Sequence, residues 1–225
     1  RIKIEPKVPK VYIKKLDYSD NLATIKVYDV KTNNLLSNIP LILNINKNFV
    51  ECITNLEGEC VFDIKPQYLN NDKKQNILIT LDRESILQES SEYDFVINSQ
   101  IEVELIPTNI FLIVEEYNLD TNSEQKYIAP KVKDFFIKRY PTTFVDNLIN
   151  SDISIKIYAT TRKIGSDKNE YGIYQVYSDA NIYIESNGVN ITDISVNDIK
   201  GADFGSFKQA GNKSLEKISK TIRKK

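Results

Sequence analysis

The chain of 225 residues has a formal net charge of −1, with 27% charged and 41% hydrophobic residues. This balance is ordinary for a globular protein and gives no electrostatic footprint for nucleic acid. No apolar run is long enough to span a bilayer. Histidine is absent, which removes the usual general base and the commonest metal ligand. No glycine-rich phosphate loop is present either. We therefore expect a protein that is not an enzyme and has no catalytic, cofactor-binding or metal-binding residues.

The N-terminal end gives two weaker indications. The chain begins at Arg1 and contains no methionine, which indicates a processed product or a fragment. Whether an export signal, a lipid anchor or an upstream domain has been removed stays open. Residues 1–10 hold two prolines and four positive charges. This composition indicates a linker or an extended lead-in strand.

Residues 11–107 carry patterns of β structure throughout. Ala23, Ile25 and Val27 alternate with polar neighbours, and Pro40 opens an apolar strand where a missing N–H is tolerated. Roughly seven short strands without a helical period predict a β-sandwich of about 100 residues. The clearest strands are predicted at 22–30, 41–45, 49–54, 60–64, 77–81 and 93–106.

Two cysteines fall in this region. Residues 49–54 and 60–64 flank a loop in which Gly58 supplies a positive φ, so they are predicted to form a β-hairpin. Cys52 and Cys60 lie in its two arms. Strict alternation across a four-residue loop places them on opposite faces, so pairing requires a five-residue loop. A disulfide in an oxidising compartment and two buried thiols stay open as alternatives.

A turn and a loop within residues 23–64 carry a family resemblance. The first motif is a turn before a proline-led strand, and the second is a loop that ends in a glycine and an aromatic residue. The matching residues are Asp29, Thr32, Asn33, Asn34, Pro40, Thr54, Glu57, Gly58 and Phe62. This run resembles the prealbumin-like or carboxypeptidase-regulatory-like module of exported bacterial proteins, which is related in form to immunoglobulin-like (Ig-like) modules. Asn34 stands where the family often has glycine. The resemblance implies a β-sandwich that serves as a spacer or an adhesive scaffold.

Residues 108–225 are predicted to form a second, α+β domain. An apolar run at 110–114 suits a central strand. A helical pattern at 127–140 stops at Pro141, three strands follow, and a last helix is predicted over 206–222. The order is β-α-β-β-β-α, which predicts a mixed sheet with both helices on one face.

Local signals refine this second domain. Asn187 and Gly188 form a strong two-residue turn signal between the second and third strands. The alternation breaks between Ile191 and Ile194, which predicts a bulge or a bend. The last helix opens on a capping pattern, and its apolar stripe comprises Phe207, Ala210, Ser214, Leu215, Ile218 and Ile222.

The face of the sheet away from the helices is the candidate interaction face. The alternation places Lys156, Tyr158, Tyr177 and Tyr183 on it. Tyrosine offers a large contact area with a polar tip, although cross-strand packing on a wet face is the simpler alternative. Glu115 and Glu116 end a strand, and adjacent strand residues point to opposite faces, which disfavours a paired-carboxylate site.

The end of the chain carries a second resemblance, in a glycine-containing turn and the helix after it. The matching residues are Lys200, Gly201, Ser206, Ala210, Gly211, Lys213 and Leu215. They are similar to a bacterial envelope domain found in flagellar and small outer-membrane lipoproteins, in the curli-secretion lipoprotein and in the N-terminal domain of the Tol–Pal propeller protein. Ser214 stands where alanine is usual. The resemblance implies a periplasmic or outer-membrane-associated location and assembly work, often within rings.

Together these patterns and resemblances favour a non-catalytic structural or assembly protein of the bacterial cell envelope. Its expected partners are other envelope proteins, within a larger envelope, flagellar or secretion machine, or copies of itself in a homo-oligomer or ring. The alternative is an envelope binding module that recognises a peptide or a glycan. That module would use the tyrosine-bearing face or the open edge of the second sheet.

Overall fold

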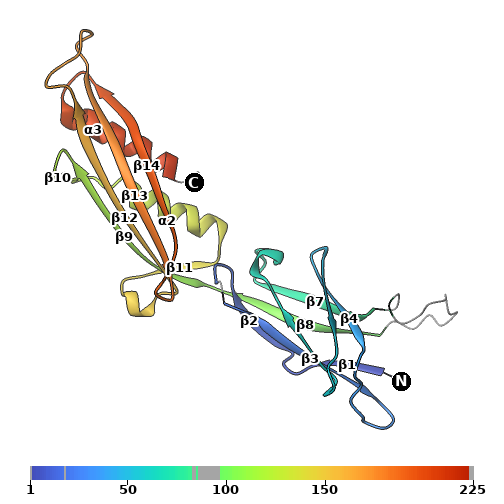
Figure 1. The fold of residues 1–225 in the computed structure, drawn as a ribbon. Coiled ribbons are helices and arrows are strands. Elements are labelled where there is room, and N and C mark those ends of the chain that lie inside the picture. The colour runs from blue at the N-terminus through green and yellow to red at the C-terminus, as the bar shows by residue number, and fades with distance from the viewer. Residues whose placement is uncertain (1, 18, 83–84, 86–96, 223–225) are drawn as a thin grey trace. The chain divides into compact units, whose positions relative to one another are not determined.

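The computed structural model describes residues 2–17, 19–82, 85 and 97–222 (Figure 1). The chain divides into two compact units, residues 1–106 and 107–225. Both units are rich in β-strand, and both contain a mixed sheet in which parallel and antiparallel pairs occur. Within the described residues, no helix is long and apolar enough to cross a membrane.

The first unit contains two sheets. A three-stranded antiparallel sheet has the order β1-β3-β6, and a five-stranded mixed sheet has the order β2-β8-β7-β4-β5. A short 3-10 helix, η1 (Pro66–Tyr68), joins them between β6 and β7. The strands are β1 (Ile2–Pro6), β2 (Lys10–Lys14), β3 (Leu22–Asp29), β4 (Pro40–Ile45), β5 (Asn48–Ile53), β6 (Glu59–Asp63), β7 (Lys74–Leu81) and β8 (Asn98–Ile106).

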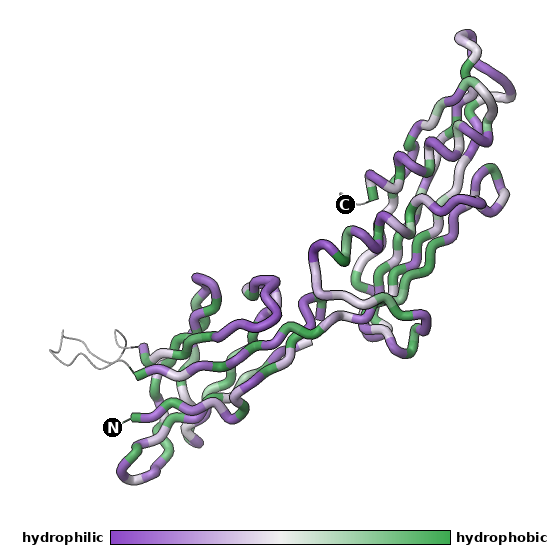
Figure 2. The backbone as a smooth tube through the Cα atoms, turned by 180° about the vertical axis from the view of Figure 1, so that it is seen from behind, coloured by the Kyte–Doolittle hydropathy of each residue, from purple (hydrophilic) through white to green (hydrophobic). Residues whose placement is uncertain are grey.

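One hydrophobic core lies between these two sheets. Each strand contributes alternate apolar side chains, which is visible as the alternating hydropathy along the backbone in Figure 2. Ile25 and Phe62 come from the three-stranded sheet, while Leu43, Ile79 and Val103 come from the five-stranded sheet. All five are at most 1% exposed. The burial of these side chains is the main stabilising term of the unit.

The N-terminal residues decide between the two expectations for that segment, a linker or a lead-in strand. Residues 2–6 are not a linker, because they form β1 and pair with β3 along its length. Ile4 is buried in the shared core, so this lead-in strand is part of the fold. In the predicted strand 93–106, residues 93–96 lie outside the described part of the chain, and β8 begins at Asn98.

The predicted hairpin of residues 49–54 and 60–64 is wrong. Strand β5 pairs with β4 in one sheet, and β6 pairs with β3 in the other. The loop between them crosses from sheet to sheet, held by a hydrogen bond from Thr54 Oγ1 to the carbonyl of Leu36 at 2.8 Å. Gly58 has the predicted positive φ, +62°, and a Cβ there would lie 2.9 Å from Leu35 Cβ. Local alternation could not reveal the crossing, because sheet membership depends on contacts distant in sequence.

Cys52 and Cys60 form a disulfide, with an S–S distance of 2.06 Å. Because they belong to β5 and β6, the bond joins the two sheets at one end of the core. The expectation that the two cysteines lie on opposite faces assumed a hairpin, so it does not apply to this pair. The bond closes a loop with a sequence separation of 8.

Reduction of this disulfide should destabilise the first unit. Since the closed loop is short, the loss in free energy of unfolding should fall near the low end of about 2–4 kcal/mol. Denaturant melts with and without reductant measure the loss, and the Cys52→Ser/Cys60→Ser double variant serves as a chemical control. Equal midpoints in oxidised and reduced protein would contradict an intersheet cross-link.

The turn after β3 explains the first half of the sequence motif. The carboxylate of Asp29 accepts hydrogen bonds from the backbone N–H groups of Lys31 at 2.8 Å and Thr32 at 2.9 Å. These bonds to the charged form lower the pKa of Asp29 from its ordinary value of 3.8 to about 2. Asn33 follows with φ +58°, a conformation that asparagine tolerates. The motif therefore fixes a turn.

This pKa shift predicts an acid-dependent contribution to stability. Because the folded pKa of Asp29 lies below its unfolded value, its contribution is present above pH 3.8 and is lost as the pH falls toward about 2. In the Asp29→Asn variant, the free energy of unfolding should fall less steeply over this window. Parallel slopes for the two proteins in acid titrations of stability would contradict the assignment.

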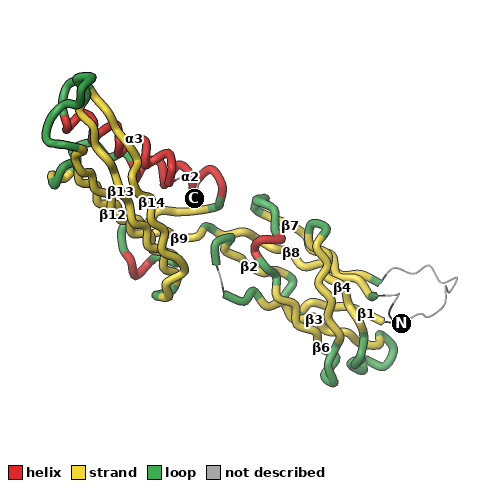
Figure 3. The backbone as a smooth tube through the Cα atoms, turned by 45° about the horizontal axis from the view of Figure 1, so that its top comes forward, coloured by secondary structure: helices red, strands yellow, loops and turns green. Residues whose placement is uncertain are grey.

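The second unit is a single mixed sheet with the strand order β10-β9-β12-β13-β14, and β11 also pairs with β9. Strands β9 and β12 are parallel neighbours, while β12, β13 and β14 are antiparallel. Helices α2 and α3 lie on the same face of the sheet (Figure 3). The elements are β9 (Thr108–Asn118), β10 (Thr121–Asn122), α2 (Ile128–Arg139), β11 (Thr142–Val145), η2 (Leu148–Asn150), β12 (Ile153–Ile164), β13 (Tyr174–Ser186), β14 (Val189–Asp203) and α3 (Phe207–Ile222).

The predicted turn and the predicted bulge in this sheet are both confirmed. Asn187 and Gly188 have φ of +50° and +77° and join β13 to β14 as a two-residue turn. The register between the two strands shifts at Ile191, so that one extra residue of β14 lies there. A second shift at Asp198, with φ +60°, was not visible in the alternation pattern.

Helix α3 approaches the sheet very closely, and two glycines make this approach feasible. A Cβ on Gly211 would lie 1.9 Å from Asn118 Oδ1, and a Cβ on Gly201 would lie 2.2 Å from the carbonyl oxygen of Ala210. Between them, the hydroxyls of Ser214 and Ser178 are 2.7 Å apart and both are buried. We call this contact the small-residue seam. It comprises Ser178, Gly201, Ala210, Gly211 and Ser214, together with Asn118. The predicted capping residue, Ser206, accepts a hydrogen bond from the N–H of Gln209 at 3.2 Å.

A buried carboxylate fixes the other helix. Glu116 on β9 is 0% exposed and accepts hydrogen bonds from the N–H of Tyr127 at 2.9 Å and of Ile128 at 3.0 Å. These are donors that the first turn of α2 leaves without intrahelical partners, and the positive end of the helix dipole favours the carboxylate. Its neighbour Glu115 is exposed on the opposite face, as alternation predicts.

Candidate interaction face

The face of the second unit's sheet that α2 and α3 do not cover is the candidate site. We call it the open face. Its side chains come from β9, β12, β13 and β14, which the strand register brings side by side. The residues include Ile113, Glu115, Tyr117, Lys156, Tyr158, Arg162, Tyr177, Asp179, Tyr183, Glu185 and, on β14, Asp193.

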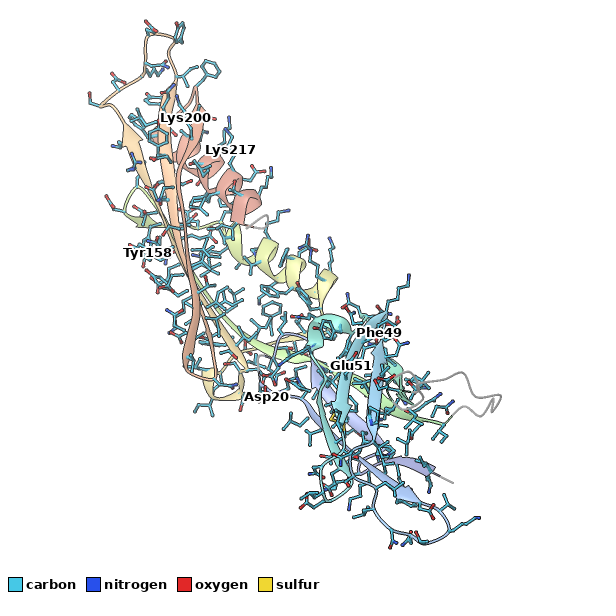
Figure 4. All side chains as sticks on the ribbon, turned by 45° about the vertical axis from the view of Figure 1, so that its right-hand side comes forward. Asp20, Phe49, Glu51, Tyr158, Lys200 and Lys217 are labelled. Carbon is cyan, nitrogen blue, oxygen red and sulfur yellow. A yellow bond between two sulfur atoms is a disulfide. The ribbon has the colours of Figure 1, made fainter. Side chains whose placement is uncertain are left out.

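The centre of the open face is apolar and aromatic. Tyr158 and Tyr183 are 46% and 42% exposed, and Ile113 is 37% exposed. The ring of Tyr117 lies 5.5 Å from that of Tyr158, centroid to centroid. Figure 4 shows Tyr158 on the side of the sheet away from the helices. Rigid aromatic side chains that stay this exposed supply contact area at low entropic cost.

One end of the open face is charged. Arg162 Nε donates to Asp179 Oδ2 at 3.1 Å, and its guanidinium also reaches Asp198 on β14. The hydrogen bond to Asp179 and the two negative charges raise the pKa of Arg162 above its ordinary value. The guanidinium lies 4.8 Å from the ring centroid of Tyr177. These contacts form a polar network that holds β12, β13 and β14 in register.

The four residues expected from the sequence lie on the same face, but they differ in what they offer. Tyr158 and Tyr183 present free ring surface. Tyr177 packs under Arg162, which is the cross-strand role given as the simpler alternative. Lys156 lies opposite Tyr183 and pairs with Glu185 at 3.5 Å. The contact area of the open face therefore rests on two of the three tyrosines.

The sequence reading missed Ile113 and Tyr117, which complete the apolar centre. The sequence pattern predicts that the first strand of this unit ends at Glu115 and Glu116, which leaves Tyr117 outside it. Strand β9 continues to Asn118, which places Tyr117 on the same face as Ile113 and Glu115. The parallel pairing of β9 with β12, which sets Glu115 opposite Tyr158, could not be read from either strand alone.

The opposite face holds a groove that the two helices leave uncovered. Its volume is about 180 Å³, and its lining is apolar. We call it the apolar groove. Its lining residues are Val132, Phe135 and Phe136 on α2, Ile222 on α3, and Ile155, Ile157, Ile182, Ile184 and Ile194 on the sheet. Among the described residues, no group of three or more His, Cys, Asp or Glu side chains is placed to hold a metal ion.

Comparisons with known proteins add no family assignment. No protein-family model matches this chain, and a search of curated proteins found no significant match.

Proposed function

We propose that this protein is an exported, non-catalytic scaffold of the bacterial cell envelope, and that its second unit binds a protein partner through the open face. The observation that carries the proposal is the exposed aromatic centre of that face, Tyr158 and Tyr183 beside Ile113. Soluble sheets commonly keep one wet, polar face. A face with exposed aromatic rings and a charged rim instead has the composition of a protein interface.

The proposed location rests on the first unit. A disulfide between Cys52 and Cys60 forms and persists in an oxidising compartment, such as the periplasm or the outside of the cell. Two sheets around one core, with the turn at Asp29 and the crossing loop at Gly58, support an immunoglobulin-like or prealbumin-like sandwich. Modules of that kind act as spacers, which suits a scaffold.

The proposed family of the second unit rests on the motif at its end. Five of the seven motif residues have a structural role: Ser206 caps α3, Gly201 and Gly211 admit the helix, Leu215 is fully buried, and Lys213 forms an ion pair with Asp203 at 2.6 Å. The motif is therefore a fold signature with no chemistry of its own. This supports kinship with the envelope lipoprotein domain and an assembly role at the periplasm or outer membrane.

Truncation of the exposed tyrosines tests the proposed function. The Tyr158→Ala/Tyr183→Ala double variant should weaken binding to the envelope partner by about tenfold or more, because buried tyrosines are frequent interface hot spots. Tyr171, 72% exposed in the loop between β12 and β13, provides the matched control, and Tyr171→Ala should bind normally. The partner is first identified by cross-linking the folded protein in envelope extract, and affinity is then measured with that purified partner.

The result can count against the proposal in two ways. Equal affinity of the double variant and the wild type would exclude the open face as the binding surface. Absence of any saturable partner in envelope fractions would exclude the scaffold role. The folding of each variant is checked by denaturant melts, since both tyrosines lie on the wet face and their loss should cost little stability.

A further inference from the structure

The edge of the second sheet offers a binding surface of its own. Strand β14 spans 15 residues and is the last strand in the sheet order, with β13 as its only strand partner among the described residues. The opposite edge is different, because β10 and β11 pair with the two ends of β9. An edge strand presents a row of backbone N–H and C=O groups that a further strand can bind.

The second half of β14 is protected against such pairing. Asp198 lies in a bulge with φ +60°, which bends the strand. Lys217 on α3 donates from Nζ to the carbonyl of Lys200 at 2.9 Å, which blocks that acceptor (Figure 4 labels both lysines). Gly201 is buried under the helix. Natural edge strands use bulges and lysines in this way to prevent pairing.

The first half of β14 shares one of these features, the bulge at Ile191. Residues 189–196, which we call the bare edge, contain no lysine and no proline, and Asp193 is their one charged residue. Val189 and Ile191 are 64% and 37% exposed. Residues 192–196, which follow this bulge, have no lysine, proline or further bulge, so this part of the bare edge is left accessible.

The bare edge lies beside the apolar groove. Ile194 belongs to both, and its neighbour on β13 across the sheet is Ile182, which also lines the groove. A strand added next to β14 at the usual spacing of about 4.8 Å would project alternate side chains over this groove. Apolar side chains at those positions would cover Ile194.

We propose that the bare edge binds an extended segment of a protein partner, which adds a strand to the sheet. The segment has apolar residues at alternate positions, directed at the groove, and a basic residue opposite Asp193. The charge argues for a different protein over a second copy, because self-pairing here would bring together two strands whose one charged residue is Asp193. The inference rests on the proposed role in protein binding but uses the backbone edge of the sheet, which meets the open face at Asp193, the cross-strand neighbour of Tyr183.

A synthetic peptide tests the inference on the full chain. The probe Lys-Val-Thr-Val-Lys-Val-Thr-Val-Lys alternates valine with polar residues and carries the required charge. On binding, amide hydrogen exchange in residues 189–196 should slow by about tenfold or more, with no change in the strands of the first unit. The same peptide with methylated backbone nitrogens keeps its side chains but cannot donate to the edge, and it should not bind.

A charge reversal supplies the matched protein variants. Asp193→Lys places like charges opposite each other and should weaken peptide binding by about fivefold. Asp167→Lys makes the same change in the distant loop before Tyr171 and should have no effect. The Tyr158→Ala variant should bind the peptide normally, because Tyr158 lies on β12, two strands away from β14, so the inference and the proposed function can fail independently.

Three outcomes would overturn the inference. One is undiminished binding of the methylated peptide, and another is slowed exchange that is absent from residues 189–196. The third is a concentration-dependent dimer in sedimentation experiments that protects residues 189–196 without peptide. That dimer would identify a second copy of this chain as the occupant.

Discussion

The second unit depends on one constraint, the close approach of α3 to the sheet across the small-residue seam. Asn118 Nδ2 donates to the carbonyl of Lys208 at 2.9 Å, and Asn118 Oδ1 accepts from Thr161 at 3.0 Å. A larger residue at position 201 or 211 would push the helix outward and leave these buried polar groups unpaired, at a cost of about 1–3 kcal/mol each. The seam therefore positions α3, and with it the burial of Leu215 and Ile218.

This arrangement leaves two surfaces of the unit uncovered. Both helices lie on one face, where α3 covers the seam and α2 is anchored by Glu116, so the tyrosine-bearing face stays uncovered. The two helices do not cover their whole face, and the apolar groove remains beside the bare edge of β14. The protein thus keeps two apolar surfaces exposed to solvent, which is costly unless they serve binding.

Much of the fold could be predicted, because short sequence patterns determine its turns, strands and helix ends. Asn187-Gly188, the break at Ile191 and the cap at Ser206 each act within a few residues, and the structure has all three. The pairing of β5 and β6 with strands of different sheets could not be predicted, because it depends on contacts far apart in sequence. For the same reason, only some residues of the open face could be predicted from the sequence. Period-two alternation identifies Tyr158 and Tyr183, but the parallel neighbour that supplies Tyr117 is fixed by the crossover through α2.

The most direct test of this account is the sign of the stability change in Gly211→Ala. Helix propensity alone predicts that alanine stabilises α3 by up to about 1 kcal/mol. The seam predicts the opposite, a loss of about 1–3 kcal/mol, because the added methyl would overlap Asn118. Hydrogen exchange of the β12 and β13 amides measures the change in the second unit, with the β3 and β7 amides of the first unit as internal reference. Faster exchange confined to the second unit would support the account, and slower exchange there would contradict it.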